Sequence, residues 1–250
     1  MSIAATSSTG YAAPVIRGPR SRVIPLGRSV EIFDDFCHGT SVAESGAVPA
    51  VGTATWACRL IEAGGGEGSA VPTNVAGGAL LLTTDAAVDD ATVITSPSEF
   101  YSFSASKKMV FEARFQVLAA LNSNGCAFLG VAEVSDPDQP LGRDNTALLG
   151  TSHIGFSIIN GAITFSHAHD TTATTSATLA TLANATDTVL TCEYDGDNTF
   201  RAYIDGVKVL TQTLTTTPDD LMAIMVGIQN GNNAVLKTMT LDYVYFRADL

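Results

Sequence analysis

The carboxylates that could serve as catalytic acids and bases are scattered through the sequence. A retaining glycosidase needs two carboxyl groups about 5–5.5 Å apart, which a strand supplies through a pattern such as Glu-x-Asp-x-x-Glu. Glu112 and Glu133 each stand alone in their apolar stretches, and Glu193 is followed by Asp195 at the edge of a turn. No nucleophile elbow, P-loop or dinucleotide-binding motif occurs. We therefore expect no catalytic site, and a protein that is not an enzyme.

Histidine and aspartate clusters are the candidate metal ligands. Alternation along a strand places His167 and His169 on one face beside Asp170, although a polar strand end explains them equally well. Hard cations prefer oxygen ligands, so calcium is favoured over zinc. The oxygen clusters are Asp34–Asp35, Asp89–Asp90, Asp136 with Asp138, Asp195 with Asp197 and Asn198, and Asp219–Asp220. Each is also ordinary turn chemistry, so we expect no resident cofactor, with Ca²⁺ the ion to test.

The first 30 residues differ in charge from the remainder. They contain four arginines, three prolines and no acidic residue, whereas all 25 acidic residues follow them. Prolines and small residues favour an extended segment without a core of its own. It is either a solvated tail or an arm that lies along a neighbouring subunit, and its apolar residues favour the arm. The residues expected to bind a partner are Arg17, Arg20, Arg22, Arg28, Ile16 and Ile24.

The bulk composition excludes several classes of protein. A formal net charge of −12 argues against nucleic-acid binding, which needs a positive surface. No apolar run reaches the length of a membrane span, and the first residues lack the pattern of a cleaved signal peptide. The four cysteines show no Cys-x-x-Cys spacing, so we expect free buried thiols. Low charge with positive mean hydropathy favours a surface that is partly covered by other subunits.

Short alternating segments separated by turn residues predict the elements that must position these side chains. Asp-Gly and Asn-Gly turns at residues 195–196, 205–206 and 160–161 predict a meander over 189–212 and a hairpin over 154–167. Residues 171–181 are either an edge strand or a loop, and residues 39–55 and 62–70 are predicted loops. Further strands are predicted at 30–36, 56–61, 78–84, 91–96, 107–118, 126–134, 221–229 and 237–247. The prediction is an all-β antiparallel sandwich over 31–250, preceded by an extended arm over 1–30.

Several of these segments resemble a known fold family. EYDGDNTFRAYIDGVKV, MVGIQNGNN and the terminal LDYVYF are similar to the closing strands of concanavalin-A-like, or laminin-G-like, jelly rolls. With FDDF near the start and EARFQV in the middle, the series resembles jelly-roll virion proteins of tailed bacteriophages. The resemblance implies a capsid decoration (cement) protein on the virion surface. Its partners would be capsid protein and sister subunits, in a homo-oligomer such as a trimer.

A carbohydrate-binding or receptor-binding module is the alternative, because the same architecture hosts lectins and glycosidases. Sugars stack on aromatic faces, which makes the single tryptophan, Trp56, and Tyr101 the candidate platform. A lone tryptophan in a sandwich is more often part of the core. A glycosidase ranks last among these hypotheses because the paired carboxylates are missing from the sequence pattern.

Overall fold

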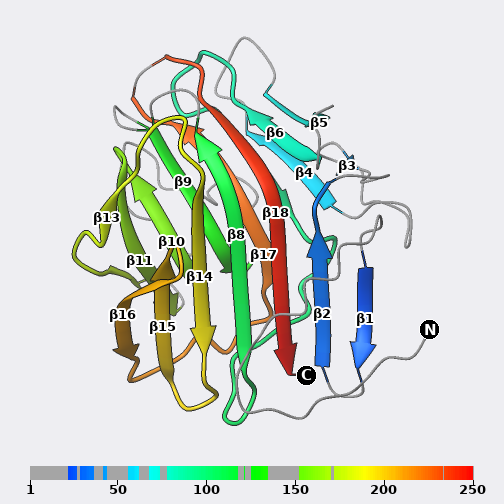
Figure 1. Ribbon diagram of the computed structural model, residues 1–250, viewed down its shortest axis with the longest axis vertical. Helices are drawn as coiled ribbons and strands as arrows, with labels where there is room; N and C mark the ends of the chain where they lie inside the picture. The colour runs from blue at the N-terminus through cyan, green and yellow to red at the C-terminus, as the bar shows by residue number, and fades with distance from the viewer. Residues whose placement is uncertain are drawn as a thin grey trace.

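A computed structural model describes residues 22–26, 29–36, 42–43, 56–61, 68–73, 78–117, 121, 125–134, 152–169, 172–232 and 234–249. These residues form two stacked sheets, with no helix among them (Figure 1). Accordingly, no helix in the described ranges is long and apolar enough to span a membrane. The predicted all-β sandwich is confirmed.

The sheet at the front of Figure 1, here called sheet A, has nine strands. Its main path runs β1-β2-β18-β8-β14-β15-β16, and β6 pairs with both β18 and β5. In that order the strands are β1 Arg22–Leu26, β2 Ser29–Asp34, β18 Thr238–Asp249, β8 Met109–Val117, β14 Thr188–Tyr194, β15 Thr199–Ile204 and β16 Val207–Thr213, with β6 Ala79–Thr83 and β5 Ser69–Thr73.

The sheet behind it, sheet B, also has nine strands, in the order β12-β11-β10-β9-β17-β7-β4-β3, with β13 paired to β11. Only the short β3–β4 pair is parallel among the described pairings. The strands are β12 Thr172–Thr175, β11 Ala162–His169, β10 His153–Ile159, β9 Gly125–Ala132, β17 Ala223–Asn230, β7 Ala91–Thr95, β4 Trp56–Ile61, β3 Val42–Ala43 and β13 Ala180–Thr181.

The turns that the sequence marked have the backbone that their residues favour. Asn160 and Gly161 both have positive φ, 52° and 79°, between β10 and β11. Asp205 and Gly206, between β15 and β16, also have positive φ angles, 51° and 76°. Two successive positive φ angles match the twist of the flanking strands, and Asn, Asp and Gly tolerate them best. These turns fix the register of the two hairpins.

The main core lies between the sheets and is apolar and aromatic. Strand β8 alternates strictly, with Met109, Phe111, Ala113, Phe115 and Val117 buried and the residues between them partly exposed. β14 alternates in the same way, and β18 does so on either side of a bulge between Leu241 and Tyr243, which gives sheet A one buried and one accessible face.

Sheet B differs because both of its faces are buried near the centre. Every residue of β9 and β17 is buried, as a two-sided strand requires. A second cluster, Ala91, Val93, Phe128, Ala132 and Met225, packs on the face turned away from the main core.

Two paired glycines let the Phe128 ring lie against that outer face of sheet B. Gly130 and Gly155 are opposite each other in the β9–β10 ladder. A Cβ at Gly130 would lie 2.4 Å from the Ile154 carbonyl oxygen and 2.9 Å from Phe128 Cζ. Side chains at these two positions are therefore excluded by backbone and ring together.

Two predicted loops contain more regular structure than expected, and the open choice for 171–181 falls to the edge strand. Strand β3 lies within 39–55, and β5 begins inside the stretch 62–70. Residues 172–175 and 180–181 are edge strands of sheet B. Cross-strand pairing in the tertiary fold supplies these short strands, which have little alternation of their own.

Candidate functional site

The accessible outer face of sheet A carries a cluster of tyrosines and glutamates. We define the tyrosine–glutamate face as Glu112 of β8, Thr191 and Glu193 of β14, Tyr203 of β15 and Tyr243 of β18. All five side chains alternate with core residues and are partly exposed. The ladder places Glu112 opposite Thr191, and Thr191 opposite Tyr203.

Glu112 is at the centre of the first half of this face. Its Oε1 accepts a hydrogen bond from the Tyr243 hydroxyl at 2.7 Å, and its Oε2 accepts one from the Thr191 hydroxyl at 2.8 Å. Burial, and then the hydrogen bond to Glu112, raise the pKa of the Tyr243 phenol. The phenol therefore stays protonated at neutral pH, and its ring is held in place by the carboxylate.

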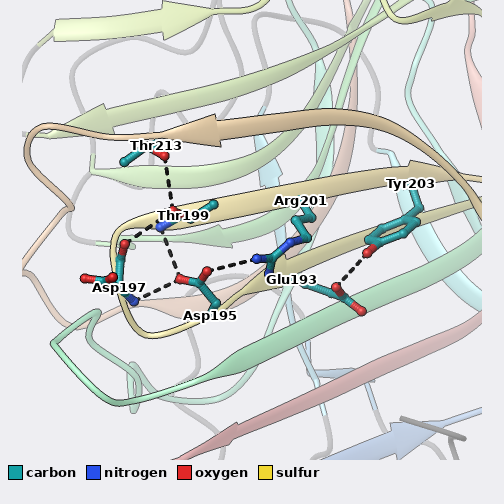
Figure 2. Close-up of polar contacts among 7 residues, drawn as sticks. All are labelled: Glu193, Asp195, Asp197, Thr199, Arg201, Tyr203 and Thr213. Atoms are coloured by element: carbon teal, nitrogen blue, oxygen red, sulfur yellow. Dashed lines mark hydrogen bonds and ion pairs between the residues drawn. The ribbon is translucent and has the colours of Figure 1, made fainter. Parts of the chain in front are cut away.

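Glu193 forms the second half in the same way. Its Oε2 accepts a hydrogen bond from the Tyr203 hydroxyl at 2.8 Å (Figure 2). Partial burial and this hydrogen bond raise the pKa of Tyr203 as well. Two aromatic rings on one sheet face are thus each oriented by a glutamate on a neighbouring strand.

Ion pairs flank the tyrosine–glutamate face. Arg114 Nη1 lies 3.0 Å from Asp242 Oδ2, and its Nη2 pairs with Asp187. Arg201 Nη2 donates to Asp195 Oδ2 at 3.1 Å (Figure 2). Arg114 and Arg201 are therefore already paired with carboxylates, and Arg247, which is also partly exposed on β18, interacts with Tyr245.

The Asp195 carboxylate also closes the β14–β15 turn. Its Oδ1 accepts hydrogen bonds from the backbone amides of Asp197 and Thr199, at 2.9 and 3.3 Å (Figure 2). Glu193 and Asp195 do share a face, as alternation predicts. Asp195, however, is a turn-forming residue whose oxygens are occupied by the chain itself.

The outer face of sheet B offers no comparable surface at its centre. Phe128, His153 and Ser166 each have a relative exposure of 0%. His153 Nε2 lies 2.8 Å from the Ser166 hydroxyl, and its ring packs edge-on against Phe128. A ligand the size of a sugar cannot reach these side chains in this arrangement.

The candidate aromatic platform of the carbohydrate-binding alternative is not at the surface, and Trp56 belongs to the core, as is more common for a lone tryptophan in a sandwich. Trp56 and Tyr101 are each only 1% exposed and lie in the main core. The Trp56 indole donates to Asp34 Oδ2 at 2.8 Å, so this side chain joins β4 to β2. Both residues are large and apolar enough that the sandwich interior buries them.

Several residues of the predicted metal clusters contact other groups. His167 and His169 bind separate partners: His167 Nε2 lies 3.1 Å from Gln212 Nε2, and His169 Nε2 lies 3.2 Å from Asp219 Oδ1. Asp34 accepts from Trp56 and from the Phe36 amide. No group of three or more His, Cys, Asp or Glu side chains in the described residues is placed to hold a metal ion. His38, Asp136, Asp138 and Asp170 lie outside those residues.

The predicted partner-binding arm is only partly within the described residues. The backbone of Arg22–Leu26, which includes Arg22 and Ile24, forms β1 and pairs antiparallel with β2. Ile16, Arg17, Arg20 and Arg28 fall outside. Binding of capsid protein and sister subunits through this arm stays a prediction, as does assembly into a trimer.

Sequence reasoning missed the tyrosine–glutamate face because its members are far apart in the chain. Glu112 and Tyr243 are separated by 131 residues, and only the β8–β18 ladder brings them together. The available signal was alternation, which places Glu112, Thr191, Glu193 and Tyr203 on the wet side of their strands but would bury Tyr243, because a bulge between Leu241 and Tyr243 shifts the pattern. Alternation does not indicate which strands are neighbours.

No family model matches the chain, and a search of curated proteins gives no match. Solved structures do share its fold. A protein of unknown function from Shewanella oneidensis aligns with a TM-score of 0.63 and 13% identity, over 92% of this chain and 91% of that one. An endo-1,3-β-glucanase from Streptomyces sioyaensis aligns with a TM-score of 0.58 and 16% identity, over 91% of this chain and 99% of that one. An endo-β-1,4-glucuronan lyase from Trichoderma reesei aligns with a TM-score of 0.53 and 13% identity, over 75% of this chain and 89% of that one.

These similarities correct one expectation and leave another without support. The prediction that the chain is not an enzyme is wrong. Two solved structures with the same fold, a glucanase and a lyase, are enzymes. That prediction rested on a missing sequence motif, whereas a fold brings carboxylates together from different strands. None of the structures named here is described as a virion protein, so the capsid decoration role gains no support from them.

Proposed function

We propose that this protein binds a polysaccharide along the tyrosine–glutamate face of sheet A. The observation that carries the proposal is the pair of accessible tyrosines, Tyr203 and Tyr243, each oriented by a glutamate. An aromatic ring offers an apolar surface to the C–H face of a sugar, and fixing the ring beforehand lowers the entropic cost of binding. The neighbouring carboxylates accept hydrogen bonds from sugar hydroxyls.

The spacing of the tyrosines favours a chain of sugars over a single one. Tyr243 lies on β18 and Tyr203 on β15, three strand spacings apart across the sheet. With neighbouring strands about 4.8 Å apart, the two strands are separated by roughly 14 Å. This separation exceeds the width of one sugar ring, so an oligosaccharide crossing the strands would contact both tyrosines.

Two further observations support this choice of ligand and face. The solved structures with the same fold include a glucanase and a glucuronan lyase, both named for polysaccharide substrates. The outer face of sheet B is buried at its centre, which leaves the outer face of sheet A as the accessible sheet surface. Whether the bound polysaccharide is also cleaved is part of the test.

The experiment measures binding of soluble polysaccharides by affinity electrophoresis and calorimetry. We expect Tyr203→Ala and Tyr243→Ala each to weaken binding about tenfold, since truncating a central aromatic contact costs on the order of 1–2 kcal/mol. Tyr203→Phe keeps the aromatic ring, so we expect it to lose less affinity than Tyr203→Ala. Leu221→Ala, at an exposed position outside this face, is the matched control and should bind like the wild type.

Product analysis on the same samples tests for turnover. Release of reducing ends would indicate hydrolysis, and absorbance from an unsaturated product would indicate elimination. Binding that is unaffected by both tyrosine-to-alanine changes would overturn the proposed site. Failure of every polysaccharide class to bind the wild type would overturn the proposed function itself.

A further inference from the structure

We infer that the polysaccharide recognised by this face is uncharged, an inference that rests on the proposed function. The fold leaves the charge of the ligand open, because it is shared by a glucanase and a glucuronan lyase. The charged groups on and beside the tyrosine–glutamate face indicate whether the ligand is charged, because their existing partners limit what else they can bind.

A polyuronate would need cationic partners for its carboxylates, and Arg114 of β8 and Arg201 of β15 are already occupied. Arg114 pairs with both Asp187 and Asp242. Arg201 is paired with Asp195, which the turn amides hold in place. A uronate carboxylate would have to displace one of these internal carboxylates, with no net gain of ion pairs.

The glutamates between the tyrosines also disfavour an anionic ligand. Glu112 and Glu193 lie on adjacent strands, and each accepts a hydrogen bond from a tyrosine hydroxyl. The two carboxylates therefore present acceptor oxygens, and no donor of their own, to a ligand lying between the rings. A uronate placed between the rings would therefore meet two like charges, whereas neutral sugar hydroxyls would find acceptors.

The charge of the whole chain acts in the same direction. The formal net charge is −12, so long-range electrostatics slow the approach of a polyanion. A neutral polysaccharide avoids this repulsion, and its binding depends on stacking and hydrogen bonds. Such contacts are little affected by salt, which gives the inference a second, independent readout.

The test compares three probes on the wild-type protein: laminarin as a neutral glucan, polyglucuronate as a polyanion and chitosan as a polycation. We expect binding to laminarin, with an affinity that changes by less than about twofold between 50 and 500 mM NaCl. We expect polyglucuronate to bind at least about tenfold more weakly. In a Glu112→Gln/Glu193→Gln variant, uncharged side chains of similar shape replace the two carboxylates. We expect its affinities for laminarin and polyglucuronate to differ less than those of the wild type.

Each result bears on one claim. Preferential binding of polyglucuronate or of chitosan, with strong salt dependence, would overturn the inference of an uncharged ligand but leave polysaccharide binding intact. Absence of binding to all three probes would count against the proposed function instead. Because the wild-type comparison decides the matter, the outcome does not depend on how well the glutamine variant folds.

Discussion

Tyr101 illustrates how a single buried hydroxyl affects stability. Its ring packs edge-on against Phe103, with centroids 4.9 Å apart, and against Phe246 at 5.6 Å. Its hydroxyl is buried and has no hydrogen-bond partner among the described residues. Burial raises the pKa of this phenol, so it is neutral throughout the ordinary pH range. The aromatic packing stabilises the core, whereas the unpaired hydroxyl costs about 1–3 kcal/mol.

We therefore expect Tyr101→Phe to leave the free energy of unfolding unchanged or to raise it by about 1 kcal/mol. The measurement is urea unfolding followed by the fluorescence of Trp56, the only tryptophan in the chain. Tyr101→Ala, which also removes the ring, should cost about 3–5 kcal/mol. A loss of more than 1 kcal/mol in the phenylalanine variant would show that the hydroxyl is hydrogen-bonded.

At the scale of elements, β11 of sheet B and β16 of sheet A are joined by one polar contact. The Gln212 Nε2 atom can only donate, so His167 Nε2 must accept, which requires a neutral imidazole. Burial lowers the pKa of His167, in agreement with the neutral form. In the unfolded chain this histidine titrates near pH 6.5, so its contribution to stability is present above that pH and lost below it.

We predict that the stability difference between the wild type and His167→Gln depends on pH in this direction. The difference in free energy of unfolding should be constant above about pH 7.5 and fall as the pH is lowered through about 6.5. Thermal or urea unfolding at a series of pH values measures it. Both proteins keep the other three histidines, so effects common to the two proteins cancel in the difference. A difference that grows on acidification would contradict the neutral assignment.

On the scale of the whole molecule, a buried contact at the opposite edge also links the sheets. Trp56 belongs to β4 of sheet B, and Asp34 ends β2 of sheet A (Figure 1). The Asp34 carboxylate accepts from the Trp56 indole and from the Phe36 amide, both at 2.8 Å. Asp34 is 1% exposed, so this link lies inside the sandwich.

Asp34→Ala should lower the free energy of unfolding by about 2–5 kcal/mol, because two buried donors would lose their acceptor. Asp34→Asn keeps one carbonyl oxygen and should cost less. Trp56 fluorescence reports on both the unfolding transition and the environment of the indole. A loss below about 1 kcal/mol for the alanine variant would show that water or another group replaces the carboxylate.

The elements were largely predictable from the sequence because their signals are local. The Asn160-Gly161 and Asp205-Gly206 turns and the alternation over 107–118 needed no knowledge of the rest of the chain. Cys58, Cys126 and Cys192 are buried free thiols, as their spacing suggested, whereas Cys37 lies outside the described residues. Short strands such as β3 and β5 were missed because pairing partners, not their own residues, define them.

The sequence by itself determined the all-β class and the positions of most strands, because alternation and turn chemistry act over a few residues. Only the tertiary structure decided which accessible residues are neighbours and which sheet face is open. Tyr243 meets Glu112 across 131 residues of chain, and Trp56 enters the core instead of a binding surface. Strand order and packing between sheets are long-range properties, and no local pattern encodes them.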